Sequence, residues 1–143
     1  MIAIAIIVLA ATSLVVLGDR TVAETEFYSR YNTAIFLTKE GMEILSDDTV
    51  RGEADPGDGE EYFINYEDKG DGFLWEDENN ECEDTNLVIV DDYYSYGDGD
   101  ETNFSRCAYL EEKDDSIEAE VIVYFEHRGT EYDVTLYRTF YDE

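Results

Sequence analysis

An uncharged, apolar run at the start of the chain places the strongest limit on the fold. It reads MIAIAIIVLAATSLVVL over Met1–Leu17 and continues without a break into an amphipathic segment. It has neither the positive front region nor the small-residue cleavage site that are typical of a signal peptide. A membrane-spanning helix needs about 20 residues, with about 17 as the lower limit. We therefore expect this run to lie in a membrane or against copies of itself.

The segment from Asp19 to Leu45 has a helical period, which predicts one helix continuous with the apolar run. Arg20 and Glu24 are spaced to form an ion pair on its exposed face. Ser46-Asp47-Asp48, followed by Gly52 and Pro56, ends the pattern. The residues expected to pack against the rest of the protein lie three or four positions apart, or a multiple of this, and are Phe27, Tyr31, Ile35, Met42 and Leu45.

The remainder of the chain has the features of an antiparallel sheet. Two long runs at the C-terminus, 117–126 and 131–140, alternate apolar and polar residues and are separated by Arg128-Gly129, which predicts a hairpin with one buried face. Shorter strands are expected at 62–64, 73–75, 87–90 and 104–110, and a loop at 93–100. The sequence thus predicts an α+β fold, in which a long N-terminal helix packs on a small antiparallel sheet.

Charge and composition divide the chain into three parts. Residues 1–18 form an apolar helix, residues 19–48 are the amphipathic half of the same helix, and residues 49–143 form an acidic, β-rich head. The formal net charge of −28 lies entirely after Gly18 and would repel nucleic acid. Twelve Tyr, seven Phe and one Trp can bury enough apolar surface for the acidic part to fold.

No arrangement of residues indicates an enzyme. The single histidine, His127, lies beside the predicted hairpin turn, and no serine or threonine has the context of a nucleophile. Two cysteines, Cys82 and Cys107, are expected to form one disulfide in an exported chain, worth about 3 kcal/mol. Two free thiols are the alternative, and a zinc site with one His and two Cys is a poor ligand set.

Acidic loops that contain glycine are candidate calcium sites, because calcium takes six to eight oxygen ligands. None has the spacing of an EF-hand, so the main expectation is a protein without a cofactor. The candidate ligands are Asp55, Asp58, Asp68, Asp71, Asp98 and Asp100. Asn103-Phe104-Ser105 is an N-glycosylation sequon.

The residues AIFLTKEGMEIL at Ala34–Leu45 resemble a segment, A-x-x-L-x-x-E-G-x-E, found in many type IV pilin-like proteins. The apolar run before it is similar to the N-terminal helix of that family, and the C-terminal hairpin resembles the family's last strands. The family's Gly-Phe cleavage site and the glutamate that follows it are absent. We expect either a sequence that starts inside the full protein, which the shortness of the run favours, or a subunit without that glutamate.

The resemblance implies a structural subunit that is held in a membrane, then polymerises through its helix into an extracellular filament of identical copies. The alternative is a monomeric surface binding protein or adhesin, for which the same run is a membrane anchor. Small and branched side chains in the run allow helices to approach closely, which suits a filament core. The predicted core residues are Ile2, Ile4, Ile6, Ile7, Leu9, Leu14, Val15 and Leu17.

Overall fold

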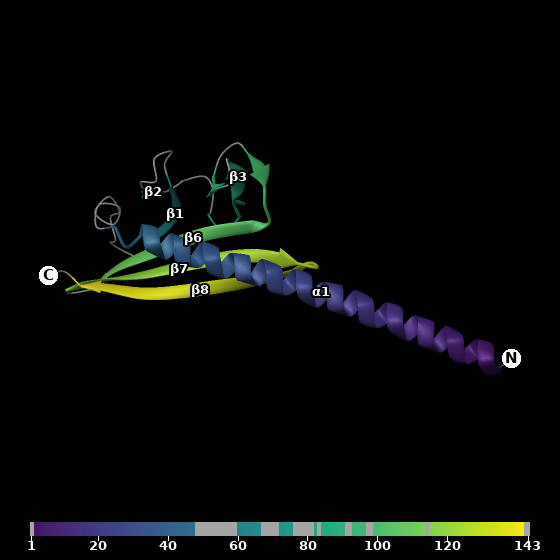
Figure 1. The fold of residues 1–143 in the computed structure, drawn as a ribbon. Coiled ribbons are helices and arrows are strands. Elements are labelled where there is room, and N and C mark those ends of the chain that lie inside the picture. The colour runs from purple at the N-terminus through teal and green to yellow at the C-terminus, as the bar shows by residue number, and fades with distance from the viewer. Residues whose placement is uncertain are drawn as a thin grey trace. The chain divides into compact units, whose positions relative to one another are not determined.

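The computed structural model describes residues 2–47, 60–66, 72–75, 82, 84–90, 93–96, 99–113 and 115–141. Within these residues, one helix is followed by eight strands (Figure 1). The elements are α1 (Ile2–Ile44), β1 (Glu60–Tyr66), β2 (Gly72–Trp75), β3 (Val88–Val90), β4 (Tyr93–Ser95), β5 (Asp100–Glu101), β6 (Phe104–Lys113), β7 (Ser116–His127) and β8 (Thr130–Tyr141). The predicted α+β class and the long N-terminal helix are confirmed.

The chain divides into two compact units, Met1–Asn32 and Thr33–Glu143, and each is described by itself below. Helix α1 contributes to both units and ends close to the predicted position. Its last turn tightens, because the amide groups of Ser46 and Asp47 donate to the carbonyl groups of Glu43 and Ile44 at 3.0 and 3.1 Å. The hydroxyl of Ser46 also donates to the carbonyl of Met42 at 2.8 Å. The final carbonyl groups of the helix are satisfied in this way.

The strands form two antiparallel sheets. The larger sheet has the order β2-β1-β6-β7-β8, and the smaller has the order β4-β3-β5. The predicted C-terminal hairpin is confirmed: β7 and β8 pair from Ser116↔Tyr141 to His127↔Thr130. Arg128 (φ 54°) and Gly129 (φ 75°) form the two-residue turn, with both residues in the left-handed region that suits the twist of a hairpin.

The prediction of a loop at 93–100 was wrong in part. Tyr93–Ser95 forms β4, and Asp100 belongs to β5. Both strands pair with β3, in the registers Ile89↔Tyr94 and Ile89↔Asp100. The glycine and aspartate content of this segment indicated a loop. The preference of tyrosine for extended backbone and the apolar β3 beside it favoured strands instead.

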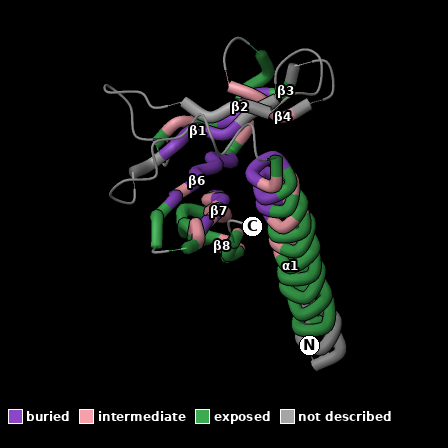
Figure 2. The backbone as a smooth tube through the Cα atoms, turned by 90° about the vertical axis from the view of Figure 1, so that its left-hand side faces the viewer, coloured by how far each residue is buried: buried purple, intermediate pink, exposed green. Residues whose placement is uncertain are grey.

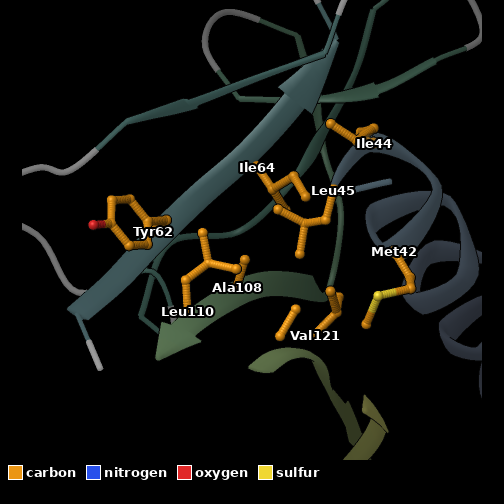
Figure 3. Packing of buried hydrophobic residues seen from close by; sticks show 9 residues of the cluster. Met42, Ile44, Leu45, Tyr62, Ile64, Ala108, Leu110 and Val121 are labelled. Carbon is orange, nitrogen blue, oxygen red and sulfur yellow. The ribbon is translucent and has the colours of Figure 1, made fainter. Parts of the chain in front are cut away.

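The main core lies between the C-terminal part of α1 and one face of the larger sheet. Figure 2 shows buried residues at that end of the helix and on the inner strands of the larger sheet. Along β7, buried Ala119, Val121, Val123 and Phe125 alternate with more exposed residues, as the period-2 pattern predicts. Figure 3 shows how side chains from the helix and the strands interdigitate in this core. The buried cluster consists of Met42, Ile44, Leu45, Tyr62, Ile64, Ala108, Leu110, Ala119 and Val121.

A second, smaller cluster includes the disulfide. Cys82 and Cys107 are bonded, as predicted, and are fully buried beside Phe63. Tyr96, Tyr109 and Tyr124 are partly buried against them. Cys107 and Ala108 are adjacent in β6, and side chains alternate across a strand, so this cluster lies on the sheet face opposite the main core.

Candidate functional site

Most of the exposed large hydrophobic side chains that the structure describes lie on α1 within Met1–Asn32. Those that precede Asp19 are between 61% and 71% exposed. They include five of the predicted filament-core residues. These are Ile4, Leu9, Leu14, Val15 and Leu17, and Val16 is similarly exposed. The side chains of the other three, Ile2, Ile6 and Ile7, lie outside the described residues.

The apolar surface extends around the helix and does not form one narrow stripe. Leu14, Val15, Val16 and Leu17 are consecutive, and successive residues of an α-helix are about 100° apart around its axis. All four are more than 60% exposed. One neighbouring element can cover only part of such a circumference, so burial of this segment needs several neighbours.

Part of the apolar run Met1–Leu17, which the sequence predicts to lie in a membrane or against copies of itself, falls on residues whose side chains lie outside the described part of the chain. Within the part of the chain that the structure describes, no helix combines the length and the hydropathy needed to cross a bilayer. The apolar run ends at Leu17, and Asp19 and Arg20 follow directly after Gly18.

The hydroxyl groups on this part of α1 are satisfied inside the helix. Thr12 and Ser13 donate to the carbonyl of Leu9 at 3.0 and 2.8 Å. Thr21 and Thr25 donate to the carbonyl groups one turn earlier, each at 2.9 Å. Burial of an unpaired hydroxyl is unfavourable. Because these donors are already paired, a neighbour can cover them without leaving an orphaned donor.

The polar and aromatic half of the same unit has more local contacts. Arg20 and Glu24 form the predicted ion pair at 3.2 Å. The ring of Phe27 stacks on Tyr31 at a centroid distance of 6.0 Å and meets Tyr28 edge-on at 5.7 Å. Two residues of the predicted packing set, Phe27 and Tyr31, therefore belong to Met1–Asn32.

The other three residues of that set belong to Thr33–Glu143. Met42 and Leu45 are buried in the main core, and Ile35 is partly buried. Ala34 and Leu37, which are 0% and 2% exposed, also contribute to the packed face of α1. The hydroxyl of Thr38 lies 2.7 Å from the carbonyl of Ala34 and 3.3 Å from that of Val134, so it also ties the helix to β8.

A buried arginine that the sequence analysis did not identify connects α1 to the sheet. Arg106 on β6 is completely buried, and its Nη1 lies 2.7 Å from Oε2 of Glu40 and 3.4 Å from the carbonyl oxygen of Leu37. Its Nη2 donates to the carbonyl of Ile64 on β1 at 2.8 Å. The signal available in the sequence was a single arginine among apolar residues in the strand predicted at 104–110. The arginine therefore links α1, β6 and β1.

The backbone of Arg106 is held from a fourth segment. Its amide donates to the hydroxyl oxygen of Tyr96 at 3.1 Å, and the same hydroxyl donates to the carbonyl of Arg106. The pairing of β1 with β6 ends at Phe63↔Cys107, and Arg106 is the adjacent residue of β6 just beyond this pair. The tyrosine hydroxyl thus satisfies backbone groups at the point where β1 leaves β6.

Gly41 allows α1 to approach the sheet at this junction. A Cβ atom at this position would lie 2.9 Å from Cγ1 of Val121 and 3.2 Å from Cδ of Arg106. Only a residue without a side chain fits here unless Val121 moves. The structure therefore explains both residues of the Glu40-Gly41 pair: Glu40 pairs with Arg106, and Gly41 leaves room for Val121.

The other candidate residues are not brought together. Asp55, Asp58, Asp68, Asp71 and Asp98 lie outside the described residues, and Asp100 is exposed. Among the described residues, no three His, Cys, Asp or Glu side chains are placed to hold a metal ion. Asn103 is exposed between β5 and β6, and His127 is partly buried at the end of β7.

Comparisons with known proteins do not place this chain in a family. No family model, no curated protein and no solved structure matches it.

Proposed function

We propose that this protein is a structural subunit that polymerises through α1 into an extracellular filament of the type IV pilus kind. One observation carries the proposal: an uncharged helical segment exposes large apolar side chains around its whole circumference. Leaving such surface in water is unfavourable by roughly 25 cal/mol per Å². The same segment of other copies has the matching composition and can cover it from several sides.

The kind of contact determines the kind of assembly. If one part of the helix packs against a different part of the next copy, the contact is heterologous and does not have to close into a ring. Repetition of a contact that does not close produces an open helical filament. The self-satisfied hydroxyl groups of Thr12, Ser13, Thr21 and Thr25 favour such burial, because none of them needs water as a partner.

The packing of the second unit supports the resemblance to pilin-like proteins. The matched residues Ala34 and Leu37 are buried, Glu40 pairs with Arg106, and Gly41 lies against Val121. The segment that carries the resemblance is thus the segment that attaches the helix to the sheet. In the proposed filament, the acidic surface of this unit would face water and limit lateral association through charge repulsion.

Electron microscopy of the purified full-length protein at moderate salt tests the proposal. We expect filaments from the wild type and dispersed particles from Leu14→Glu, because a carboxylate would have to be buried in the filament core. Tyr141→Glu is a matched control, because Tyr141 on β8 is 76% exposed and Leu14 is 70% exposed. The control should still form filaments. Dispersed wild-type particles with α1 intact would refute the proposal.

A further inference from the structure

Helix α1 contains two glycines, and packing within the chain explains only one of them. At Gly41, a Cβ atom would collide with Val121 and crowd Arg106, so the glycine permits close contact between the helix and the sheet. At Gly18, a Cβ atom would meet nothing within 4 Å among the described residues beyond the adjoining helix backbone. Its φ is not positive, so an alanine could adopt the same backbone. Glycine is nevertheless the least favourable residue for a helix interior after proline.

The surface around Gly18 is apolar and uncharged. Leu14, Val15 and Val22 are 70%, 71% and 55% exposed, and all three lie within about 60° of Gly18 around the helix axis. Thr25 lies on the same side and pairs its hydroxyl with the carbonyl of Thr21. We call these five residues, Leu14, Val15, Gly18, Val22 and Thr25, the Gly18 face.

The charged residues near Gly18 point elsewhere. Glu26, Asp19, Glu24 and Arg20 lie about 80°, 100°, 120° and 160° from Gly18 around the axis, outside the range of about 60° that holds the Gly18 face. In a chain with a net charge of −28, a continuous uncharged exposed face of this kind has a limited set of suitable partners. An acidic surface of another copy would lose the hydration of its carboxylates there, without an opposite charge to compensate.

We infer that the Gly18 face is where α1 of a second copy crosses this helix at close range. The uncharged complement is present in the chain itself, as the apolar run that ends at Leu17. Glycine at the crossing removes the side chain that would hold the two backbones apart, and close approach increases the dispersion contacts between them. Gly18 would then do between copies what Gly41 does within one. This inference rests on the proposed assembly, and it adds the contact point and the reason for the glycine.

A size series at position 18 tests the inference. The critical concentration for filament formation would be measured by sedimentation for the wild type, Gly18→Ala and Gly18→Leu. If leucine overpacks a close contact, the critical concentration should rise slightly for Gly18→Ala and at least about tenfold for Gly18→Leu. Ala23→Leu is the control, because Ala23 lies about 140° around the helix from Gly18. The critical concentration of Ala23→Leu should stay within about twofold of the wild-type value.

Folding of the variants is checked by circular dichroism. The space around Gly18 is open and both replacements favour helix, so helicity should be retained or increased. If glycine instead served to let the helix bend, alanine and leucine would impair assembly equally, and the inference would be wrong. Equal critical concentrations for the wild type and Gly18→Leu would also overturn it. A wild type that does not assemble would instead refute the proposed function.

Discussion

Arg106 shows how one buried charge can organise a junction between chain segments. Its guanidinium group donates to the carboxylate of Glu40 and to the backbone carbonyl groups of Leu37 and Ile64. A buried cation without its counter-ion is strongly unfavourable, whereas a paired one contributes mainly to the choice of one arrangement. The pair therefore fixes which turn of α1 lies over β6.

Removal of the counter-ion should be costly. We expect Glu40→Ala to lower the free energy of unfolding by about 3 kcal/mol, because Arg106 would remain buried without a carboxylate. Urea denaturation measures this change. Glu43→Ala, an exposed position on the same helix, should change the value by less than about 0.5 kcal/mol.

The double variant Glu40→Ala/Arg106→Met distinguishes the buried charge from lost packing. It should recover only part of the stability, because the carbonyl groups of Leu37 and Ile64 lose a donor. A double variant less stable than Glu40→Ala alone would contradict this account.

Tyr137 on β8 provides a prediction about pH. A hydrogen bond to Glu120, together with the negative charge of that carboxylate, raises the pKa of the Tyr137 phenol above its usual value. The folded state therefore holds this proton more tightly, and the associated stability is present below the ordinary tyrosine pKa and lost as pH rises through the raised value. Glu120→Ala should lower the pKa of Tyr137. NMR of ¹³Cζ-labelled tyrosine can follow it, with Tyr137→Phe to assign the signal, and an unchanged pKa would contradict the prediction.

The elements differ in how well the sequence predicted them. The long helix and the C-terminal hairpin were predicted because their patterns repeat over many residues and do not depend on distant partners. β4 and β5 were missed because both pair with β3, and the register Val88↔Glu101 joins positions that no local pattern connects. The contacts of Arg106 were missed for the same reason, since Glu40 and Ile64 lie far from it in sequence. The disulfide was predictable from cysteine count alone, whereas the tyrosines that pack around it were not.

One substitution in the turn between β7 and β8 should make the protein more stable. Arg128 has a φ of 54°, where most side chains are unfavourable and asparagine is well tolerated. We expect Arg128→Asn to raise the free energy of unfolding by about 0.5–1 kcal/mol. Thermal denaturation measures the gain. Arg128→Ala is the control and should show none, because alanine keeps the Cβ penalty; a gain from alanine would show that backbone strain is not the cause.

At the scale of the whole molecule, charge sets the conditions under which the fold is stable. The net charge of −28 lies entirely in the part of the chain after Gly18, so carboxylates there repel one another in the folded state. The chain has nine Lys and Arg against 37 Asp and Glu, so most of these acids have no basic residue to pair with. Salt should therefore stabilise the protein by screening.

The melting temperature should rise by at least about 5 °C between 0.01 and 1 M NaCl, since the screening length falls from about 30 to about 3 Å. Scanning calorimetry measures this, and tetramethylammonium chloride at equal ionic strength should give a similar rise. A melting temperature that is constant or falls with salt would contradict the role assigned to repulsion.

The position of Arg106 beside Cys107 has a mechanical consequence. Part of a tension applied to the Thr33–Ile44 part of α1 would be transmitted to β6 through the Glu40–Arg106 pair, beside the apolar core contacts and the contact of Thr38 with β8. The next residue along β6 is covalently joined to Cys82, and β7 pairs with the strand along its whole length. This part of a tensile load would thus pass from the helix into the strand of the sheet that is secured by a covalent bond. Breaking the backbone hydrogen bonds on one side of β6 would not be enough to release that strand.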